Sequence, residues 1–476
     1  MTASGATLLV LVLYLVGITA FGSYLGRRRK SVDDYFLAER SVPWWAIAAC
    51  VVATETSVLT FTSVPGFSYA GDWSFLQLAI GYVLGRIVIA VWLIPAYFRG
   101  KVVTSYELLR NRFGTAVRSV AAAVFLVYRT LADGVRLHAA ALVVSIAIGT
   151  PEIYIILLLA TAMIIYTEEG GVKATIWTDV LQMFVYVAGA IVVLVTVIGV
   201  LPDGSVSEAL AAAADADKLR VFVFSFDPSV TYTVAAGVIG GMFLTLATHG
   251  TDHYLVQRLL VARSAREASI GLVLSGFLVM AQFALFLFIG TMLWRYYGAR
   301  PFARGDDILP TFIAEQLPGP LLGFILAGVV AAALSPSLNS LASTTVNDFY
   351  LPHVDPNLSE KGQVRLGRLF TVFWGLAQTA VAIVAQGASS ALEAGLLALS
   401  FASGPTVGAF LLAISNRHAT SFGALAGMVC GLIAPFVADW LAPAPISFLW
   451  KVTVGSIVTY VVASALSMRP RAYEAK

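Results

Sequence analysis

Leu334-Ser335-Pro336-Ser337-Leu338-Asn339-Ser340 places three hydroxyls and an amide inside a segment that otherwise has the composition of a membrane-spanning helix. Lipid offers no hydrogen-bond partners, so these groups must face protein, an ion or a cavity. A second such segment, Ala53-Thr54-Glu55-Thr56-Ser57, also carries a carboxylate. Together the two segments predict a polar site buried within a helical bundle, which is the arrangement that a transporter needs.

The composition is that of an integral membrane protein made of α-helices. Of the 476 residues, 59% are hydrophobic and 12% are charged, whereas soluble proteins carry about 25% charged residues. The net charge of +3 is small, and the basic residues form no nucleic-acid patch, so we expect no nucleic-acid partner. Cys50 and Cys430 both lie in apolar segments, which argues against a disulfide framework.

Thirteen segments are long enough to cross about 30 Å of hydrocarbon. They are residues 6–27, 43–71, 74–98, 116–148, 151–167, 171–200, 229–250, 265–296, 318–349, 365–385, 390–415, 420–443 and 446–467. The first is followed by Arg27-Arg28-Arg29-Lys30, the reverse of the order in a signal peptide, which predicts a retained helix. Lys and Arg concentrate in the first, third and other odd-numbered loops and in the C-terminal tail. By the positive-inside rule we expect the N-terminus outside and the C-terminus inside, in one membrane domain over 1–476.

The second segment, 43–71, has the sequence of a discontinuous helix. Hydroxyl and β-branched residues surround Glu55, and Pro65-Gly66 follows. An unwound helix exposes carbonyl oxygens to a cavity, and hard cations such as Na⁺ prefer oxygen ligands. Because an ionisable group at this depth is costly, we interpret Glu55 as a substrate or proton ligand. The alternative is a structural carboxylate bonded to neighbouring hydroxyls.

Two further groups of charges lie in apolar segments. Arg129, Asp133 and Arg136 share one helix face and predict an ion triad that neutralises itself. The alternative is recognition of a substrate anion by one of the arginines. Asp179 lies about one turn inside the sixth segment, where it either binds a cation or is solvated at the interface. His249 could titrate near neutral pH, but its place at the end of a segment favours a capping or surface role for it, and likewise for His253.

The motifs of soluble enzymes are absent from the sequence. There is no Walker A loop, His-Glu-x-x-His pair, Gly-x-Ser-x-Gly elbow or CxxC motif. We therefore expect a protein that is not an enzyme, and any uphill transport must be driven by an ion gradient.

Several stretches, in this order and spacing, resemble the sodium:solute symporter family, which includes sodium/glucose cotransporters and proline and sialic-acid permeases. The most specific match is Gly170-Gly171-Val172-Lys173-Ala174 through Trp177-Thr178-Asp179-Val180-Leu181-Gln182. The other matching stretches are Asp33 to Arg40, Ala53 to Ser57 with Val64-Pro65-Gly66, Ser105 to Gly114, Gln257-Arg258, and Asn339-Ser340 with Asp348-Phe349-Tyr350.

The resemblance implies the LeuT-type inverted-repeat fold. Two five-helix repeats of opposite topology would enclose a site near the middle of the membrane. The parts of the chain expected for this fold are an extra N-terminal helix (6–27), a core (43–250 and 265–415) with the repeats at 43–200 and 229–415, and two C-terminal helices (420–467).

The resemblance also implies a sodium site formed by carbonyls of Ala53 and Thr56, a carbonyl of Ala332 and the hydroxyl of Ser335. In this alignment Pro336 replaces a second hydroxyl, and about three residues are missing from the helix. Anchoring the match at Asn339-Ser340 instead puts alanines at both hydroxyl positions. Some relatives have a second cation site at the aspartate matching Asp179, which here could take a cation or a proton or organise an inner gate.

The resulting prediction is a sodium-coupled symporter of a small polar organic solute. The expected solute ligands are Glu55, Ser57, Asn339 and Thr248. Pro405 and Thr406 are the expected gate, within a second helix break at 401–406. Sugars or polyols and amino acids are favoured equally as solutes, with monocarboxylates third.

The alternative is a proton-coupled or sodium-independent carrier with a degenerate sodium site, and a membrane sensor is a more distant one. We expect Na⁺ as coupling ion with H⁺ as the alternative, the solute and the lipid bilayer as partners, and function as a monomer. The expected location is the plasma membrane, as a multi-pass protein of the bacterial inner membrane.

Overall fold

Helices form every regular element that the structure describes. The computed structural model describes residues 5–26, 37–56, 58–100, 102–202, 204–298, 300–333, 337–387 and 391–467. These residues contain no β-strand, and one isolated bridge joins Val42 to Ala262. The prediction of an all-α protein is therefore confirmed.

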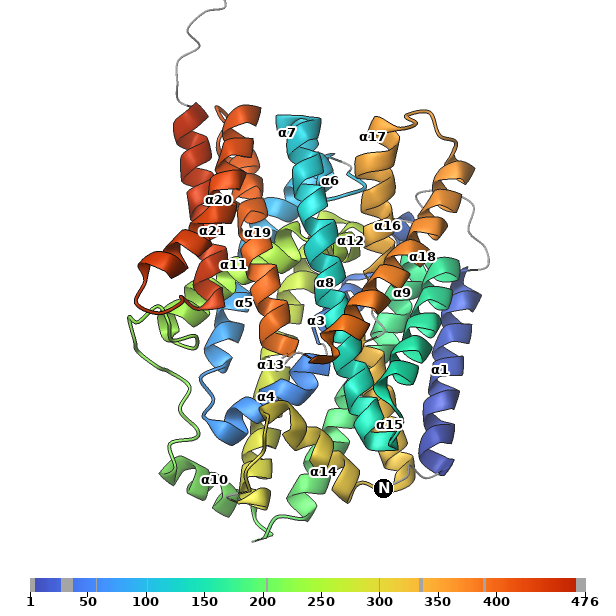
Figure 1. Cartoon of the computed structure of the whole chain (residues 1–476), viewed down its shortest axis with the longest axis vertical. Coiled ribbons are helices and arrows are strands. Elements are labelled where there is room, and N and C mark those ends of the chain that lie inside the picture. Colours follow the sequence, from blue (N-terminus) through green and yellow to red (C-terminus); the bar gives the residue numbers. More distant parts are fainter. Residues whose placement is uncertain are drawn as a thin grey trace, which may run out of the picture.

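The first part of the chain runs from the N-terminus to the helix at the lower end of Figure 1. Its elements are α1 (Gly5–Gly26), η1 (Ala38–Arg40), α3 (Trp44–Glu55), α4 (Val58–Ala70), α5 (Leu76–Val88), η2 (Ile89–Leu93), α6 (Ile94–Gly100), α7 (Glu107–Phe113), α8 (Thr115–Ile148), α9 (Glu152–Gly199) and α10 (Val206–Asp215).

The second part packs against the first (Figure 1). Its elements are η3 (Ala236–Gly240), α11 (Gly241–Thr245), η4 (Leu246–Thr251), α12 (His253–Leu260), α13 (Ala265–Tyr297), η5 (Gly305–Asp307), α14 (Ile308–Gln316), α15 (Gly319–Ala333), α16 (Leu338–Thr344), η6 (Thr345–Tyr350), α17 (Leu351–His353), α18 (Glu360–Val384), η7 (Ala385–Gly387), α19 (Ala391–Ser415), α20 (Ser421–Leu441) and α21 (Phe448–Ser467). The packing against the first part is mainly through α13, α15, α18 and α19.

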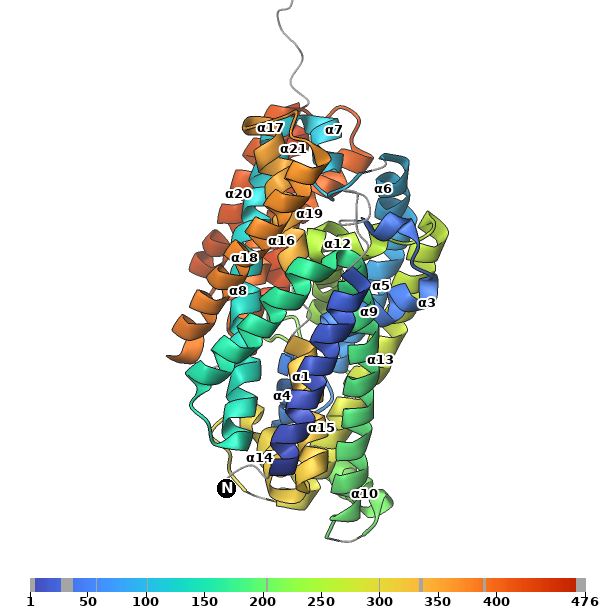
Figure 2. The ribbon, with the colours of Figure 1, turned by 90° about the vertical axis from the view of Figure 1, so that its right-hand side faces the viewer.

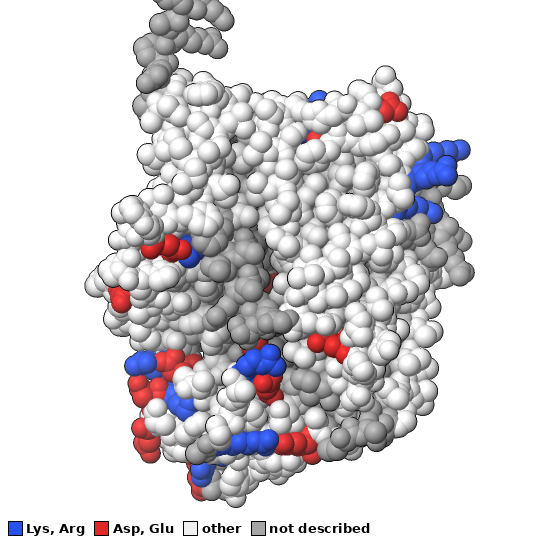
Figure 3. Space-filling model, viewed as in Figure 1, with Lys and Arg blue, Asp and Glu red and all other residues white. Residues whose placement is uncertain are grey.

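The described part of the chain holds eight helices that are long and apolar enough to cross a membrane, or nine if the bent pair α3 and α4 is one span. Their outward faces carry exposed large apolar side chains, such as Leu13 on α1 and Val429 on α20. Exposed apolar faces of this kind are typical of contact with lipid or with another protein. Together with the eight apolar helices, they confirm the integral membrane class. Figure 3 shows the largest gathering of Lys, Arg, Asp and Glu at the lower end of the molecule, with smaller groups at the left edge and at the upper right edge and a mostly uncharged surface between them. Ion pairs at that end are Arg220–Asp72, Arg300–Glu315 and Arg304–Asp307.

The fifth and sixth predicted segments, 151–167 and 171–200, are not separate helices. They form the single 48-residue helix α9, because the sequence between them contains no proline to end the helix. At about 1.5 Å per residue, a straight helix of this length would exceed twice the hydrocarbon thickness. Figure 2 accordingly shows α9 as two limbs that meet at an angle, and the apolar stretches are Glu152–Ile165 and Val172–Gly199.

The predicted second break at 401–406 is also wrong, because α19 continues through Pro405. Proline removes one helical hydrogen bond and clashes with the preceding turn. A neighbouring helix can satisfy backbone groups freed in this way. Here the neighbouring helix is α21, whose Ser456 hydroxyl donates to the carbonyl of Gly404, one residue before Pro405, at 3.0 Å, although this is not the carbonyl that the proline frees.

The helix α13 positions α4 through one close approach. A methyl group added at Gly290 would lie 2.1 Å from the carbonyl oxygen of Pro65 and 2.2 Å from Ser68 Oγ. The Ser68 hydroxyl also donates to the carbonyl of Leu287, at 2.7 Å. Only glycine allows this packing, which fixes the later part of the second predicted segment against α13.

Candidate functional site

The expected discontinuous helix is present. α3 ends at Glu55, Thr56 leaves the helical conformation (φ −71°, ψ 95°), and α4 begins at Val58. The axes of the two halves differ by 64°. Pro65 lies inside α4 and does not mark the break. Carbonyls at the end of α3 therefore lack intrahelical partners, as the sodium prediction requires.

A second interruption, which the sequence analysis missed, lies between η4 and α12. Asp252 has extended backbone there (φ −68°, ψ 117°) and caps α12 by accepting from the amide of Tyr254, at 2.8 Å. Aspartate is a preferred residue at the start of a helix. Asp252 in the sequence Thr251-Asp252-His253 could therefore have indicated the start of a new helix.

Glu55 is held by two basic side chains. It forms an ion pair with Arg86 of α5, and its Oε2 lies 3.5 Å from His249 Nε2 of η4. Arg86 Nη2 and His249 Nε2 are 3.2 Å apart, and Thr248 Oγ1 lies 2.8 Å from His249 Nδ1. Arg86 is fully buried and His249 is 2% exposed. The carboxylate is therefore neutralised within the protein.

The expected surface or capping role of the two histidines is wrong. His249 belongs to the Glu55 group, and His253 is fully buried, with its Nδ1 accepting from the amide of Ser105 at 3.3 Å. The segment holding them is covered by α5 and by the chain before α7, which hydropathy alone could not show.

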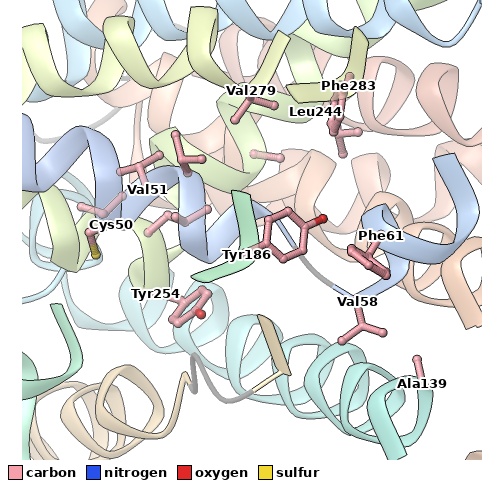
Figure 4. Packing of buried hydrophobic residues seen from close by; sticks show 14 of the residues in the cluster. Cys50, Val51, Val58, Phe61, Ala139, Tyr186, Leu244, Tyr254, Val279 and Phe283 are labelled. Atoms are coloured by element: carbon pink, nitrogen blue, oxygen red, sulfur yellow. The ribbon is translucent and has the colours of Figure 1, made fainter. Parts of the chain in front are cut away.

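A small cavity adjoins the break. It measures about 10 Å³ and is lined by Ala53, Thr56, Gln182, Met183 and Tyr186, so it has room for about one water-sized body. Figure 4 shows the Tyr186 ring near the break, with Val51 of α3 on one side and Phe61 of α4 on the other.

Polar atoms without partners surround this cavity. Among the described residues, both polar atoms of Gln182 and the hydroxyl of Tyr186 have no hydrogen-bond partner. The Thr56 hydroxyl donates to Gln282 Oε1, at 2.7 Å. Unpaired buried polar atoms are costly, and oxygens suit a hard cation. The size and the donor set therefore fit one sodium ion near Ala53 and Thr56.

Asp179 is buried. The alternative in which it is solvated at the membrane interface is therefore wrong. Its Oδ2 accepts from Arg258 Nη2 at 2.9 Å and from Arg258 Nε at 3.2 Å. The Cys50 thiol and the Thr54 hydroxyl each lie 3.3 Å from the same oxygen. Arg258 of α12 is therefore the cation that lies against the predicted second cation site.

The structure brings Arg129, Asp133 and Arg136 together on α8. The Arg129–Asp133 distance is 3.1 Å and the Arg136–Asp133 distance is 3.9 Å. Arg129 also pairs with Asp252 at 3.1 Å, so the group reaches the second helix interruption.

The other predicted residues are dispersed. Asn339 of α16 is buried and donates to Thr175 Oγ1 at 3.0 Å, and Thr248 donates to the carbonyl of Leu244 at 3.0 Å. Thr406 is buried in α19, and within the described residues its hydroxyl has no partner. Of the rest, Ala332 lies in α15 and Pro405 is buried in α19, whereas Ser57 and Ser335 lie outside the described residues.

A lysine that the sequence analysis did not single out closes the end of α4. Lys218 Nζ donates to the carbonyls of Ser68, Tyr69 and Gly71, at 3.3, 2.8 and 3.0 Å. Burial lowers the pKa of Lys218, and the nearby carboxylate of Asp72 opposes that shift. The loop after α10 is thereby attached to α4, the second half of the broken helix.

Comparison with known proteins gives a consistent result. The sequence matches the model of the sodium:solute symporter family over residues 35–431. It is 31% identical to the sodium/sialic acid symporter NanT of Aliivibrio fischeri over 471 residues, covering 95% of this chain and 91% of that protein. It is 27% identical to the sodium-coupled monocarboxylate transporter 2 of Bos taurus, covering 95% and 76% of the two chains.

Solved structures agree in fold. A Na⁺-coupled sialic acid symporter in a substrate-bound outward-open state superposes with a TM-score of 0.90 at 27% identity, over 98% of both chains. The nucleobase-cation symporter Mhp1 gives a TM-score of 0.58 at 16% identity, over 92% of this chain and 96% of that one.

Proposed function

Because the chain belongs to the sodium:solute symporter family, and is therefore a sodium-coupled transporter and not an enzyme, we propose that it moves a small polar organic solute by alternating access. The observation that carries this proposal is the break between α3 and α4, with a cavity of ionic size beside it. Sodium-coupled relatives support Na⁺ as the coupling ion, and no finding supports protons.

In the proposed sodium site, Ala53 and Thr56 supply carbonyl oxygens from the end of α3. Ala332 supplies a carbonyl from α15 and Ser335 supplies a hydroxyl. The cavity lined by Ala53 and Thr56 supports the first half of this set. Sodium binding would neutralise the free carbonyl ends of α3 and stabilise the break, since a helix C-terminus attracts cations.

The proposed solute site contains Glu55, Ser57, Asn339 and Thr248. Glu55 lies at the break, which supports its role, whereas Asn339 bonds to α9 and would have to turn from Thr175. Asp179 is proposed to organise an inner gate, supported by its ion pair with Arg258. The outer gate is proposed at Pro405 and Thr406.

The proposed architecture has about thirteen membrane crossings, with the N-terminus outside and the C-terminus inside. The inverted repeats are placed at 43–200 and 229–415, with 6–27 before them and 420–467 after them. The distribution of Lys and Arg supports this topology. We place the protein in the plasma membrane, as a bacterial inner-membrane transporter that works as a monomer.

The test is uptake into proteoliposomes under an imposed inward sodium gradient or, separately, an inward proton gradient. The labelled panel contains sugars, amino acids, sialic acid and monocarboxylates, since the relatives' names specify the last two. We expect accumulation with sodium. Accumulation with protons alone would contradict the proposal.

A further inference from the structure

Arg86 is buried in the protein because its helix, α5, packs very closely against η3 and α11. A methyl group added at Gly81 of α5 would lie 2.4 Å from the carbonyl oxygen of Gly237, and one at Gly85 would lie 2.8 Å from the carbonyl oxygen of Met242. These glycines seat α5 directly on η3 and α11, and Gly85 is the residue before Arg86. The guanidinium is fully buried as a result.

The guanidinium is incompletely satisfied. Its Nη2 serves both Glu55 and His249. Its Nε and Nη1 have no hydrogen-bond partner among the described residues. Arginine carries five N–H donors and no acceptor, and leaving such donors unpaired in the interior is costly. The position therefore favours an additional acceptor, of a kind that the surrounding side chains do not provide.

Arg86 also stands between the two helix interruptions. Glu55 is the last residue of α3, and His249 lies in η4, three residues before the break at Asp252. Sites between discontinuous helices bind the transported solute in folds built from inverted repeats. A ligand that reached Arg86 would contact both interruptions at once.

From these observations, and resting on the proposed function, we propose that Arg86 binds a carboxylate of the transported solute and that Glu55 is the exchangeable counter-ion that holds Arg86 in its absence. Arginine binds carboxylates in a two-pronged geometry. The incoming carboxylate accepts hydrogen bonds from Nε and Nη1, which have no partner among the described residues, and from Nη2, which otherwise bonds to Glu55. The solute class is thus the organic anions, and Arg86 determines the selectivity.

The proposal also explains why sodium must accompany the solute. Arg86 and Glu55 cancel one another, so an anion entering alone would add an uncompensated charge in a medium where that is expensive. The cavity at Ala53 and Thr56 immediately flanks Glu55 in the chain. A sodium ion there supplies the missing positive charge, and anion and cation are stable only together.

The opposite assignment is that Glu55 itself accepts hydrogen bonds from a neutral polyhydroxy solute. The two assignments predict opposite effects of Glu55→Gln. If Glu55 competes for Arg86, removing its charge tightens binding of the anion. If Glu55 is the ligand, the same change weakens binding of the solute.

The experiment measures uptake of matched probes by the full-length protein in proteoliposomes under an inward sodium gradient. The pairs are sialic acid with its methyl ester, lactate with lactamide, and gluconate with glucose. We expect sodium-driven accumulation of a carboxylate and not of its neutral partner. Accumulation of neutral members alone would overturn the inference and leave the proposed function standing. If no solute accumulated with sodium, both would fail.

Two variants then test the residues. For the carboxylate that is taken up, we expect Glu55→Gln to lower the half-saturating concentration severalfold. Arg86→Lys should raise it by about tenfold or more, because a charge-assisted bidentate contact is lost. Arg118→Lys is the control, since Arg118 is an equally buried arginine that faces Asp348 at 3.5 Å. It should keep the wild-type preference for the anion.

Loss of folding in Arg86→Lys would be detected from its melting temperature. The Glu55→Gln result does not depend on that variant. An unchanged or raised half-saturating concentration in Glu55→Gln would overturn the assignment of Glu55 as the competing counter-ion.

Discussion

Replacing Asp179 by asparagine should destabilise the protein by about 3–5 kcal/mol, which is the usual cost of removing one member of a buried ion pair. Arg258 is 2% exposed, so water cannot take the place of the carboxylate. Two of its guanidinium nitrogens bond to one oxygen of Asp179, at 2.9 and 3.2 Å. Arg258 also contacts Tyr254, through its carbonyl at 2.8 Å and its ring at 4.0 Å, and neither of these groups supplies the negative charge that the carboxylate provides.

The assay is thermal unfolding of the purified protein in mild detergent, for Asp179→Asn, Arg258→Gln and the double variant. Each single variant should melt well below the wild type. The double variant should recover much of the loss, because no unpaired charge remains buried. The sodium concentration for half-maximal uptake should stay unchanged in Asp179→Asn. If that variant melted normally but required more sodium, Asp179 would be a cation ligand and the reasoning would be refuted.

Three further predictions concern the sodium site and the packing. Ser335→Ala should raise the sodium concentration for half-maximal uptake, and an unchanged value would remove Ser335 from the site. Lys218→Met should cost about 1–3 kcal/mol and increase hydrogen exchange at the end of α4, whereas wild-type protection there would contradict its capping role. Gly81→Ala, with its methyl 2.4 Å from the Gly237 carbonyl, should cost about 1–3 kcal/mol by overpacking. The control is Gly17→Ala, whose methyl meets nothing within 4 Å, and equal melting of the two would contradict the packing argument.

The sequence was sufficient for the class, the family and the first helix break. A bilayer requires long apolar segments, which are visible in the composition. Hydroxyls beside Glu55 in such a segment must be satisfied within the protein, and a broken helix is one of the few structures that allows this. The sequence was insufficient for α9, because two separate helices and one bent helix containing two apolar stretches give the same hydropathy pattern. It was also insufficient for Pro405, since the packing around this proline involves another helix, on which Ser456 donates to the carbonyl of Gly404.

The partners of Glu55 could not be predicted because they depend on tertiary packing. Arg86 follows 31 residues later and His249 belongs to the other half of the chain. One physical signal was available, since an arginine inside an apolar segment needs an acceptor. Pairing Arg86 with the acid of the neighbouring segment would have followed from that rule, but the unpaired donors of its guanidinium would not.

The buried ion pairs divide the described elements into sets that we expect to move together. Glu55, Arg86 and His249 join α3, α5 and η4, whereas Arg118 and Asp348 join α8 to η6. Separating such charges inside the protein is costly, so each set should move as a unit.

One other pair runs between these sets, where Arg129 of α8 reaches Asp252 beside η4. A further pair, Arg258 with Asp179, joins α12 to α9. If alternating access rocks one set against the other, the Arg129–Asp252 contact must stretch or exchange partners. Arg129 has an alternative partner in Asp133 on its own helix, at 3.1 Å. It can therefore release Asp252 without becoming an unpaired charge. The Arg258–Asp179 pair is buried and is held through two guanidinium nitrogens, at 2.9 and 3.2 Å, so it should resist separation strongly.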